Sequence, residues 1–373
     1  MQEVFVTGPL AWPPLLGIVA GGPLDGRLRA ARLTRAALDL GADTCFPALV
    51  PAQDGVAVGV LVDLPDRRLF DRIEYVAAVL GATPVPKHIE VEGEARAAIA
   101  FLGEGEAGAG PAWDEARWAG RWGEMALTAA AEIVGYFGRK PAAEVAAHLQ
   151  MLLARAASRV SAANAAPATL RSDTSASQVE VSSREATHEG FFLTHSYDLR
   201  HPAFDGHESP ELRREVFVAT DAAIVLPYDP VRDRLLLVEQ FRMGPFGRGD
   251  PRPFVLEPVA GRVDAGETPE TTARREAWEE AGLTLHALEH MTSHYCSPGC
   301  STEFYHCYLG LTDLPDTGRG RGGLETENED IRTHVLGFER AMELVESGEA
   351  NVGPLVLMLL WLQRERPRLR SAA

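Results

Sequence analysis

The feature that most restricts the fold of this chain is a short stretch in its second half, residues 261–283, GRVDAGETPETTARREAWEEAGL. The Thr-Pro pair at 268–269 predicts a helix start, because Thr caps a first turn and Pro is tolerated within it. Gly282 predicts the end of that helix. Between these limits Glu276 and Glu280 lie one turn apart on the same helix face. The stretch therefore predicts a short helix that carries two carboxylates side by side.

Two carboxylates in this arrangement repel each other unless a cation lies between them. Carboxylate oxygens suit Mg²⁺, which keeps several waters and shares its coordination shell with substrate phosphates. A solvated acidic helix, in which Arg275 pairs with Glu279 one turn away, is the alternative for such a helix taken alone. Taken alone, the helix favours the solvated arrangement, and the metal site is preferred because of the resemblance that the whole stretch carries.

The whole stretch resembles the Nudix box, G-x5-E-x7-R-E-U-x-E-E-x-G-U, where U is an aliphatic or small residue. Its polar and glycine positions are filled by Gly261, Glu267, the pair 275–276, the pair 279–280 and Gly282. This resemblance implies a Nudix hydrolase domain with an α/β/α sandwich fold. It also implies that Arg275 is structural and that Glu267 supports the loop, the helix or the metal network.

Segments outside the box resemble one branch in particular, the ADP-ribose pyrophosphatases. They are RREVF at 213–217, PYDPVRD at 227–233, VEQFR at 238–242, SPGCSTE at 297–303 and ENEDI at 327–331. The resemblance implies hydrolysis of ADP-ribose to AMP and ribose 5-phosphate. Another nucleoside diphosphate sugar, such as a GDP-sugar, is the alternative substrate, because Cys300 stands where the branch usually has glycine.

The branch also implies which residues hold the metal. The backbone carbonyl of Ala260 and the side chains of Glu276 and Glu280 are the expected ligands, with Glu279 close by as a catalytic residue. The expected ion is Mg²⁺, with Mn²⁺ as the alternative. The ions would bridge the diphosphate, and an activated water would attack one phosphorus in line.

Four further residues correspond to positions that contact the substrate in this branch: Arg214, Glu215, Arg242 and Glu303. A guanidinium binds phosphate oxygens in a fork, which suits the two arginines to a diphosphate. Surface ion pairing is the alternative role for both arginines.

The catalytic base is expected at Glu327, the first glutamate of the ENED segment, where the branch has a mobile loop. The preceding residues are rich in glycine, which is typical of such a loop. Glu325 and Glu329 are close alternatives for the base.

Length and charge limit the remaining functions. With 373 residues the chain is long enough for two domains. Its net charge of −17 argues against binding to nucleic acid or to a membrane surface. The sequence contains no apolar run long enough to span a membrane, and it opens without the basic residues of a signal peptide. We therefore expect a cytoplasmic protein that acts on a small molecule.

The cysteines are too few and too irregularly spaced for a disulfide framework. They are Cys45, Cys296, Cys300 and Cys307. Three of them lie near His294 and His306, which makes a zinc site an alternative for this segment. The spacing does not follow a paired C-x2-C pattern.

The first half of the chain resembles the gamma-glutamylcyclotransferase-like family. Its matching segments are VFVTGPL at 4–10, FPALV at 46–50 and FDRIE at 70–74. The resemblance implies a small mixed β-barrel, with Glu74 as general base and the turn at 8–10 as the substrate loop. Fusions of these two halves resemble proteins associated with tellurite resistance.

Several residues depart from the cyclotransferase pattern. Thr7 replaces the loop tyrosine, Pro9 removes a backbone N–H, and no glycine follows Glu74. A binding or assembly domain is therefore preferred over an active cyclotransferase.

These patterns predict an α+β chain with four parts. They are a cyclotransferase-like domain at 1–110, a helical extension at 111–159, a linker at 160–178 and a Nudix domain at 179–373. Relatives form dimers through the first strands of the second domain, so a homodimer is expected.

Local patterns predict several element limits. A turn at 54–55 should precede a strand at 56–62. The tryptophan-rich stripe from residue 113 should be a helix that covers the first domain or contacts another subunit, followed by a helix at 142–157. A strand is expected at 191–193, and two final helices at 338–347 and 353–366.

Overall fold

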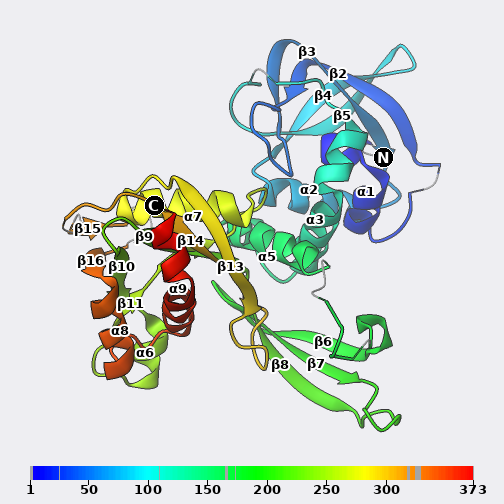
Figure 1. Ribbon diagram of the computed structural model, residues 1–373. Helices are drawn as coiled ribbons and strands as arrows, with labels where there is room; N and C mark the ends of the chain where they lie inside the picture. Colours follow the sequence, from blue (N-terminus) through cyan, green and yellow to red (C-terminus); the bar gives the residue numbers. More distant parts are fainter. Residues whose placement is uncertain are drawn as a thin grey trace. The chain divides into compact units, whose positions relative to one another are not determined.

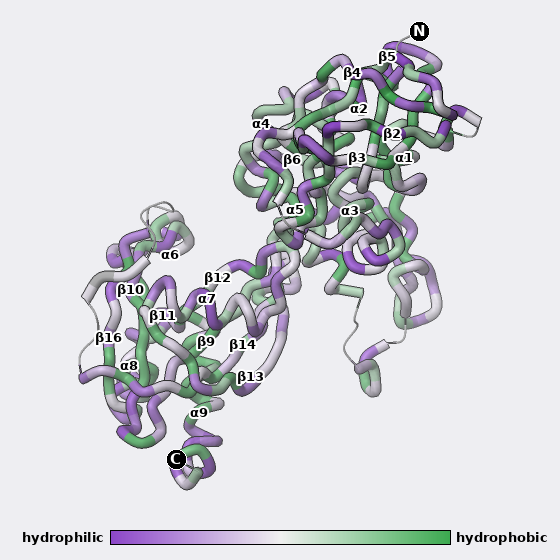
Figure 2. The backbone as a smooth tube through the Cα atoms, turned by 90° about the horizontal axis from the view of Figure 1, so that it is seen from above, coloured by the Kyte–Doolittle hydropathy of each residue, from purple (hydrophilic) through white to green (hydrophobic). Residues whose placement is uncertain are grey.

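The computed structural model describes residues 3–24, 26–108, 110–163, 167–172, 174–316, 320–323 and 329–372. The chain divides into two compact units, Met1–Pro167 and Ala168–Ala373 (Figure 1). Hydrophobic and hydrophilic residues alternate along the elements of both units (Figure 2). No helix in the described residues is long and apolar enough to cross a membrane.

The first unit contains a closed barrel with the strand order β1-β3-β2-β4-β5. All pairs are antiparallel except β1 with β5, which close the barrel in parallel. Phe5, Leu61 and Ile89 fill its interior. The predicted small mixed barrel is thus confirmed. The strands are β1 (Glu3–Thr7), β2 (Leu28–Leu38), β3 (Leu49–Asp63), β4 (Thr83–Val91) and β5 (Glu94–Leu102).

The predicted turn at residues 54–55 is wrong, because β3 runs through both residues. The bulge here is on β3, because its residues 52–55 lie between the pairs Thr34–Val56 and Ala36–Pro51, opposite the single β2 residue Arg35, which has a φ of 58°. A Cβ on Gly55 would lie only 2.8 Å from the carbonyl oxygen of Ala36. Gly55 is therefore needed because the two strands approach each other closely at this bulge, and not because the chain turns.

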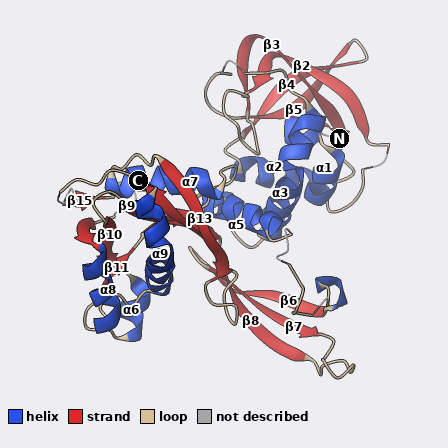
Figure 3. Cartoon of the chain, in the orientation of Figure 1, coloured by secondary structure: helices blue, strands red, loops and turns tan. Residues whose placement is uncertain are grey.

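Five helices accompany the barrel (Figure 3). In α3, Trp118 and Trp122 are buried, and the Trp118 Nε1–H donates to the carbonyl of Cys45 at 2.9 Å. The tryptophan stripe therefore belongs to the core of the first unit, which is the first of its two predicted roles. The helices are α1 (Pro13–Ala20), α2 (Arg67–Val79), α3 (Glu115–Gly135), α4 (Ala142–Ala146) and α5 (Leu149–Ser161).

The single helix predicted at 142–157 is wrong, because the chain leaves the helical conformation at His148, where φ is −115° and ψ is 15°. The first piece, α4, packs on α2, whereas α5 packs on α3. Because the helix breaks at His148, α4 and α5 can pack on two different helices.

The second unit begins with a three-stranded antiparallel sheet in the order β6-β7-β8. The predicted strand at 191–193 is mostly wrong, because Phe191 and Phe192 form the turn between β6 and β7 and only Leu193 is in a strand. Leu193 is also the buried residue of the three. The strands are β6 (Glu180–Glu189), β7 (Leu193–Arg200) and β8 (Leu212–Val218).

The rest of the second unit is an eight-stranded sheet with the order β13-β14-β9-β10-β16-β15, in which β11 pairs with β10 and β12 with β9. Its strands are β9 (Asp221–Asp229), β10 (Arg234–Phe241), β11 (Phe254–Glu257), β12 (Val259–Arg262), β13 (Ala287–Tyr295), β14 (Phe304–Leu311), β15 (Arg321–Gly322) and β16 (Ile331–Gly337). Its helices are α6 (Met243–Arg248), α7 (Pro269–Ala281), α8 (Phe338–Ser347) and α9 (Gly353–Ser371).

Both faces of this sheet are covered. Ala223 and Val225 face α7, whereas Ile224 and Leu226 face α8 and α9, because alternate residues of a strand point to opposite faces. This is the predicted α/β/α sandwich. Helix α8 has the predicted limits, but α9 passes through Pro367 to Ser371, beyond the predicted end, and buries Leu369.

Candidate active site

Helix α7 begins and ends where its sequence predicts. The Thr268 side chain accepts a hydrogen bond from the N–H of Thr271 at 3.2 Å and so caps the first turn. Gly282 ends the helix with a φ of 62°, which favours glycine. These caps fix where α7 begins and ends.

Glu276 points from α7 onto strand β12. A Cβ added to Gly261 would lie 1.8 Å from Glu276 Oε1, so the carboxyl group occupies the space that any side chain at 261 would need. The Glu276 side chain is only 13% exposed. The glycine of the box is therefore required by direct contact with the glutamate.

Glu280 lies one turn further along the same face and is 2% exposed. The N–H of Ala260, also on β12, donates to Glu280 Oε2 at 3.4 Å. The helix and the strand thus bring together the three residues that the sequence predicts as metal ligands.

Burial raises the pKa of Glu276 to about 7, although Arg275 acts in the opposite direction. Burial, and then the charges of Glu276 and Glu329, raise the pKa of Glu280 well above its ordinary range. Within the described part of the chain, no Lys, Arg or His forms an ion pair with Glu280. A buried carboxylate with so little compensation, one helical turn from Glu276, fits a bound cation.

The oxygen ligands on α7 and β12 fit a hard cation such as Mg²⁺, which retains waters. Among the described residues, no three His, Cys, Asp or Glu side chains converge into a ready metal set. The histidines and cysteines between residues 294 and 307 form no such set either. Glu276, Glu280 and the Ala260 carbonyl are the oxygen ligands that α7 and β12 offer.

Arg275 connects α7 to the loop before it. Its Nε donates to Glu267 Oε1 at 3.0 Å and its Nη2 to Glu267 Oε2 at 2.9 Å. Nη1 donates to Glu276 at 2.6 Å and to Glu279 at 2.9 Å. The hydrogen bonds to Glu267 are the main cause of the raised pKa of Arg275. Glu279 therefore lies against Arg275 rather than against β12.

Arg242, at the start of α6, belongs to the same acidic cluster. Its Nε donates to Glu257 Oε2 at 2.7 Å. Burial alone would lower the pKa of Arg242, but the charges of Glu257, Glu280 and Glu329 outweigh burial and raise it. Glu257 was missed by the sequence analysis, and its position four residues before Gly261 was the only signal.

The other predicted residues lie in three different places. Arg214 and Glu215 are exposed on β8, and none of their described hydrogen bonds or ion pairs reaches α7. Glu303 lies just before β14 and accepts hydrogen bonds from Cys296 and Tyr305.

Glu325 and Glu327 lie outside the described residues. Glu329 is described, and its charge acts on the α7 glutamates.

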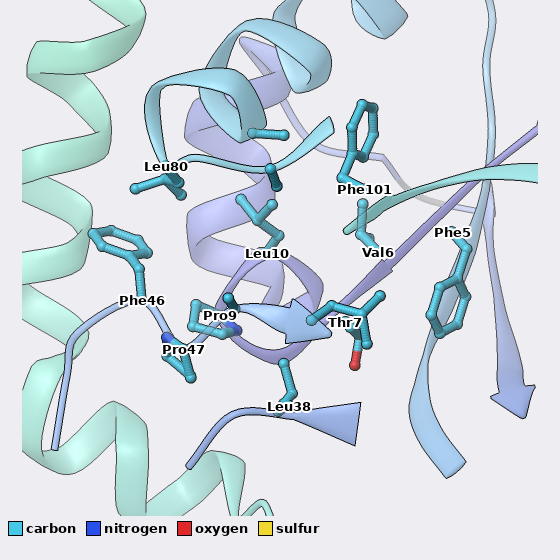
Figure 4. Close-up of a pocket in the computed structure, with 14 residues that line it drawn as sticks. Phe5, Val6, Thr7, Pro9, Leu10, Leu38, Phe46, Pro47, Leu80 and Phe101 are labelled. Atoms are coloured by element: carbon cyan, nitrogen blue, oxygen red, sulfur yellow. The ribbon is translucent and has the colours of Figure 1, made fainter. Parts of the chain in front are cut away.

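The first unit has a separate cavity of about 50 Å³ beside the turn at 8–10 (Figure 4). Thr7 carries the only polar side chain among the lining residues, and its hydroxyl donates to the Val58 carbonyl at 2.5 Å. Glu74 is half-buried on α2 and does not line the cavity. The lining residues are Phe5, Val6, Thr7, Pro9, Leu10, Leu38, Phe46, Pro47, Ala48, Leu49, Ala77, Leu80, Ala82 and Phe101.

Comparison with known proteins places this site in a family. Residues 218–355 match the model of the NUDIX domain. The ADP-ribose pyrophosphatase of Escherichia coli (strain K12) is 42% identical over 193 residues, which are 52% of this chain and 91% of that protein. The ADP-ribose pyrophosphatase of Haemophilus influenzae is 36% identical over 196 residues, 52% of this chain and 90% of that protein.

A third relative carries a different name. The GDP-mannose pyrophosphatase of Salmonella paratyphi B is 36% identical over 151 residues, which are 40% of this chain and 78% of that protein. Three relatives above 30% identity, each covered over more than two thirds of its length, agree with the domain match. Through its second unit, this chain belongs to the NUDIX family.

Proposed function

We propose that this protein is a nucleoside-diphosphate-sugar hydrolase that cleaves ADP-ribose to AMP and ribose 5-phosphate. The observation that carries the proposal is the burial of Glu276 and Glu280 side by side against β12, with no described cation directly on Glu280. The relatives named ADP-ribose pyrophosphatase support the substrate. We further propose that the hydrolase domain spans residues 179–373.

Glu276, Glu280 and the Ala260 carbonyl would hold Mg²⁺, with Mn²⁺ as the alternative. Bound there, divalent ions neutralise charge on the diphosphate and lower the pKa of the attacking water. The raised pKa values of the two glutamates support this assignment, because burial and neighbouring carboxylates disfavour their negative charge, which a bound cation would stabilise.

The chain's own residues would bind and orient the substrate. Arg242 retains donors beyond the Nε–H that it gives to Glu257, and its guanidinium suits a phosphate oxygen of the diphosphate. Arg275 would keep Glu276 and Glu279 in position through its hydrogen bonds. Glu327 is the proposed base that takes the proton from water. Glu329, which lies in the described part of the chain, is the alternative base.

Arg214, Glu215 and Glu303 are proposed to contact the nucleotide sugar. The first two are exposed on a three-stranded sheet outside the sandwich. We infer that this sheet joins two copies of the chain in a homodimer. Sedimentation of the purified protein would test that arrangement, because a monomer at micromolar concentration contradicts it.

The test of the proposed function is a panel of ADP-ribose, GDP-mannose and other nucleotide sugars, assayed with Mg²⁺ for released mononucleotide. ADP-ribose should give the highest kcat/KM, and EDTA should stop its hydrolysis. A panel without turnover at any Mg²⁺ concentration would overturn the proposal.

GDP-mannose is the second candidate substrate, for two reasons. One relative is named GDP-mannose pyrophosphatase. In addition, Cys300 places a side chain in the loop at 297–303. The same panel of nucleotide sugars decides between ADP-ribose and GDP-mannose, because the better substrate has the higher kcat/KM.

For the first unit we propose a cyclotransferase-like barrel that binds or assembles rather than catalyses. A gamma-glutamyl group carries charges, whereas the cavity beside the turn at 8–10 is almost entirely apolar and excludes Glu74 from its lining. Gamma-glutamyl peptides should therefore give no 5-oxoproline, with or without EDTA. Release of 5-oxoproline that is lost in Glu74→Gln would establish the catalytic alternative.

A further inference from the structure

The loop between β13 and β14 is closed by one residue pair, Cys296 and Glu303. The last paired residues of the two strands are Tyr295 and Phe304, and the pair lies one step beyond them. The Cys296 N–H donates to the Glu303 carbonyl at 3.2 Å. The side chains meet as well, because Cys296 Sγ lies 3.0 Å from Glu303 Oε2.

A second side chain reaches the same carboxylate oxygen. The Tyr305 hydroxyl donates to Glu303 Oε2 at 3.0 Å. Glu303 and Tyr305 are two residues apart in an extended segment, so their side chains lie on the same face. Two donors on Oε2 fix the orientation of the carboxylate, and Glu303 forms no ion pair with a described Lys, Arg or His.

The backbone beneath Glu303 is also held. The Phe217 N–H donates to the Cys300 carbonyl at 2.8 Å, and the Thr302 N–H donates to the Phe217 carbonyl at 3.0 Å. These bonds attach the loop to the end of β8. The position of the Glu303 carboxylate therefore depends on its side-chain partners rather than on the path of the loop.

Both donors keep their protons at neutral pH. Partial desolvation of the thiol and the charge of Glu303 raise the pKa of Cys296 to about 11. Burial and the same carboxylate also raise the pKa of Tyr305. A protonated thiol and a phenol can both donate a hydrogen bond to Oε2.

We propose that Cys296 and Tyr305 are positioning residues, which hold the Glu303 carboxylate by one oxygen so that the other accepts a hydrogen bond from a hydroxyl of the nucleotide sugar. This inference rests on the proposed hydrolase function and adds two residues to it. Neither side chain needs to touch the substrate. Their effect passes through the orientation of Glu303.

The test compares variants that remove or restore one donor. Cys296→Ala and Tyr305→Phe should each raise the KM for ADP-ribose by roughly tenfold, the usual size for one hydrogen bond to a charged group, and leave kcat within about threefold. Cys296→Ser supplies a hydroxyl in place of the thiol and should restore most of the wild-type KM.

Two controls distinguish a loss of Glu303 positioning from a general disturbance of the fold. Tyr295 is the exposed neighbour of Cys296, and its ring makes an edge-to-face contact with Phe304. Tyr295→Phe removes only the hydroxyl and should leave KM unchanged. In a Glu303→Ala background, Cys296→Ala should have no further effect on KM, because the two residues act through one contact.

The outcomes distinguish the inference from the function on which it rests. An active wild type whose KM stays within about twofold in Cys296→Ala and Tyr305→Phe would overturn the positioning role and leave the hydrolase assignment intact. Equal KM increases in Cys296→Ala and Cys296→Ser would also overturn it. A wild type without turnover on any nucleotide sugar would overturn both.

Discussion

Arg275 binds Glu267 through two hydrogen bonds, from Nε to Oε1 at 3.0 Å and from Nη2 to Oε2 at 2.9 Å. A guanidinium fork on a carboxylate is a strong and directional pair. Because Glu267 precedes α7 and Arg275 lies inside it, the pair holds the helix to its entry loop. The same guanidinium also reaches Glu276 and Glu279, so the geometry of the acidic face depends on it.

Replacing this arginine should therefore destabilise the second unit. Arg275→Lys keeps a charge but cannot form both bonds to Glu267, and we expect a loss of roughly 1–3 kcal/mol in its free energy of unfolding. Urea unfolding monitored by circular dichroism measures the loss. Arg248→Lys, at an exposed position on α6, is the matched control. Equal stability of the two variants would contradict a structural role for Arg275.

Adding one carbon to β12 should displace a proposed metal ligand. In Gly261→Ala the new methyl group would overlap the Glu276 carboxyl group, which must move away. We expect weaker Mg²⁺ binding and a fall in kcat/KM of roughly 100-fold or more, with the fold retained. Gly247→Ala has open space around the added carbon and should behave like the wild type. Normal Mg²⁺ activation of Gly261→Ala would exclude Glu276 as a ligand.

Removing the charge of Glu280 should abolish Mg²⁺-dependent hydrolysis. Glu280→Gln keeps the size of a fully buried side chain, so the fold should survive while turnover falls by roughly 10³-fold or more. Steady-state release of AMP across a Mg²⁺ titration measures the effect. Glu270→Gln, an exposed change at the start of the same helix, is the control. Near-normal turnover by Glu280→Gln would refute the metal assignment.

The stability of the metal-free protein should fall as pH rises from about 4.5 to about 7, the ordinary and folded-state pKa values of Glu276. In that range the folded state binds more protons than the unfolded state, so the free energy of unfolding decreases with pH. Above pH 7 the Glu276 carboxylate is charged, and Mg²⁺, which binds the ionised carboxylate, should restore stability there.

Thermal unfolding of the second unit tests this expectation in EDTA and in Mg²⁺. The increase in Tm caused by Mg²⁺ should be larger at pH 8 than at pH 5, and Glu276→Gln should remove most of the difference. A Mg²⁺ effect that is independent of pH would contradict the assignment of the raised pKa to the metal-binding face.

The limits of α7 could be predicted because its signals are local. Thr268 caps residues within its own first turn, and Gly282 adopts its conformation regardless of distant neighbours. Two other local predictions failed where a distant segment intervened. Gly55 looked like a turn residue, but it lies in a bulge of β3, where this strand passes close to β2. His148 interrupts a helical pattern because α4 and α5 pack on different helices.

For this protein, the sequence alone determined the spacing of the acidic residues on one helix, and with it the NUDIX family. Spacing along a helix follows from its 3.6-residue period, which needs no tertiary contact. Only the tertiary structure brought β12 beneath Glu276 and Glu280, Glu257 to Arg242, and Cys296 and Tyr305 to Glu303. Those neighbours are set by strand pairing and packing across the sheet, which join residues far apart in the chain.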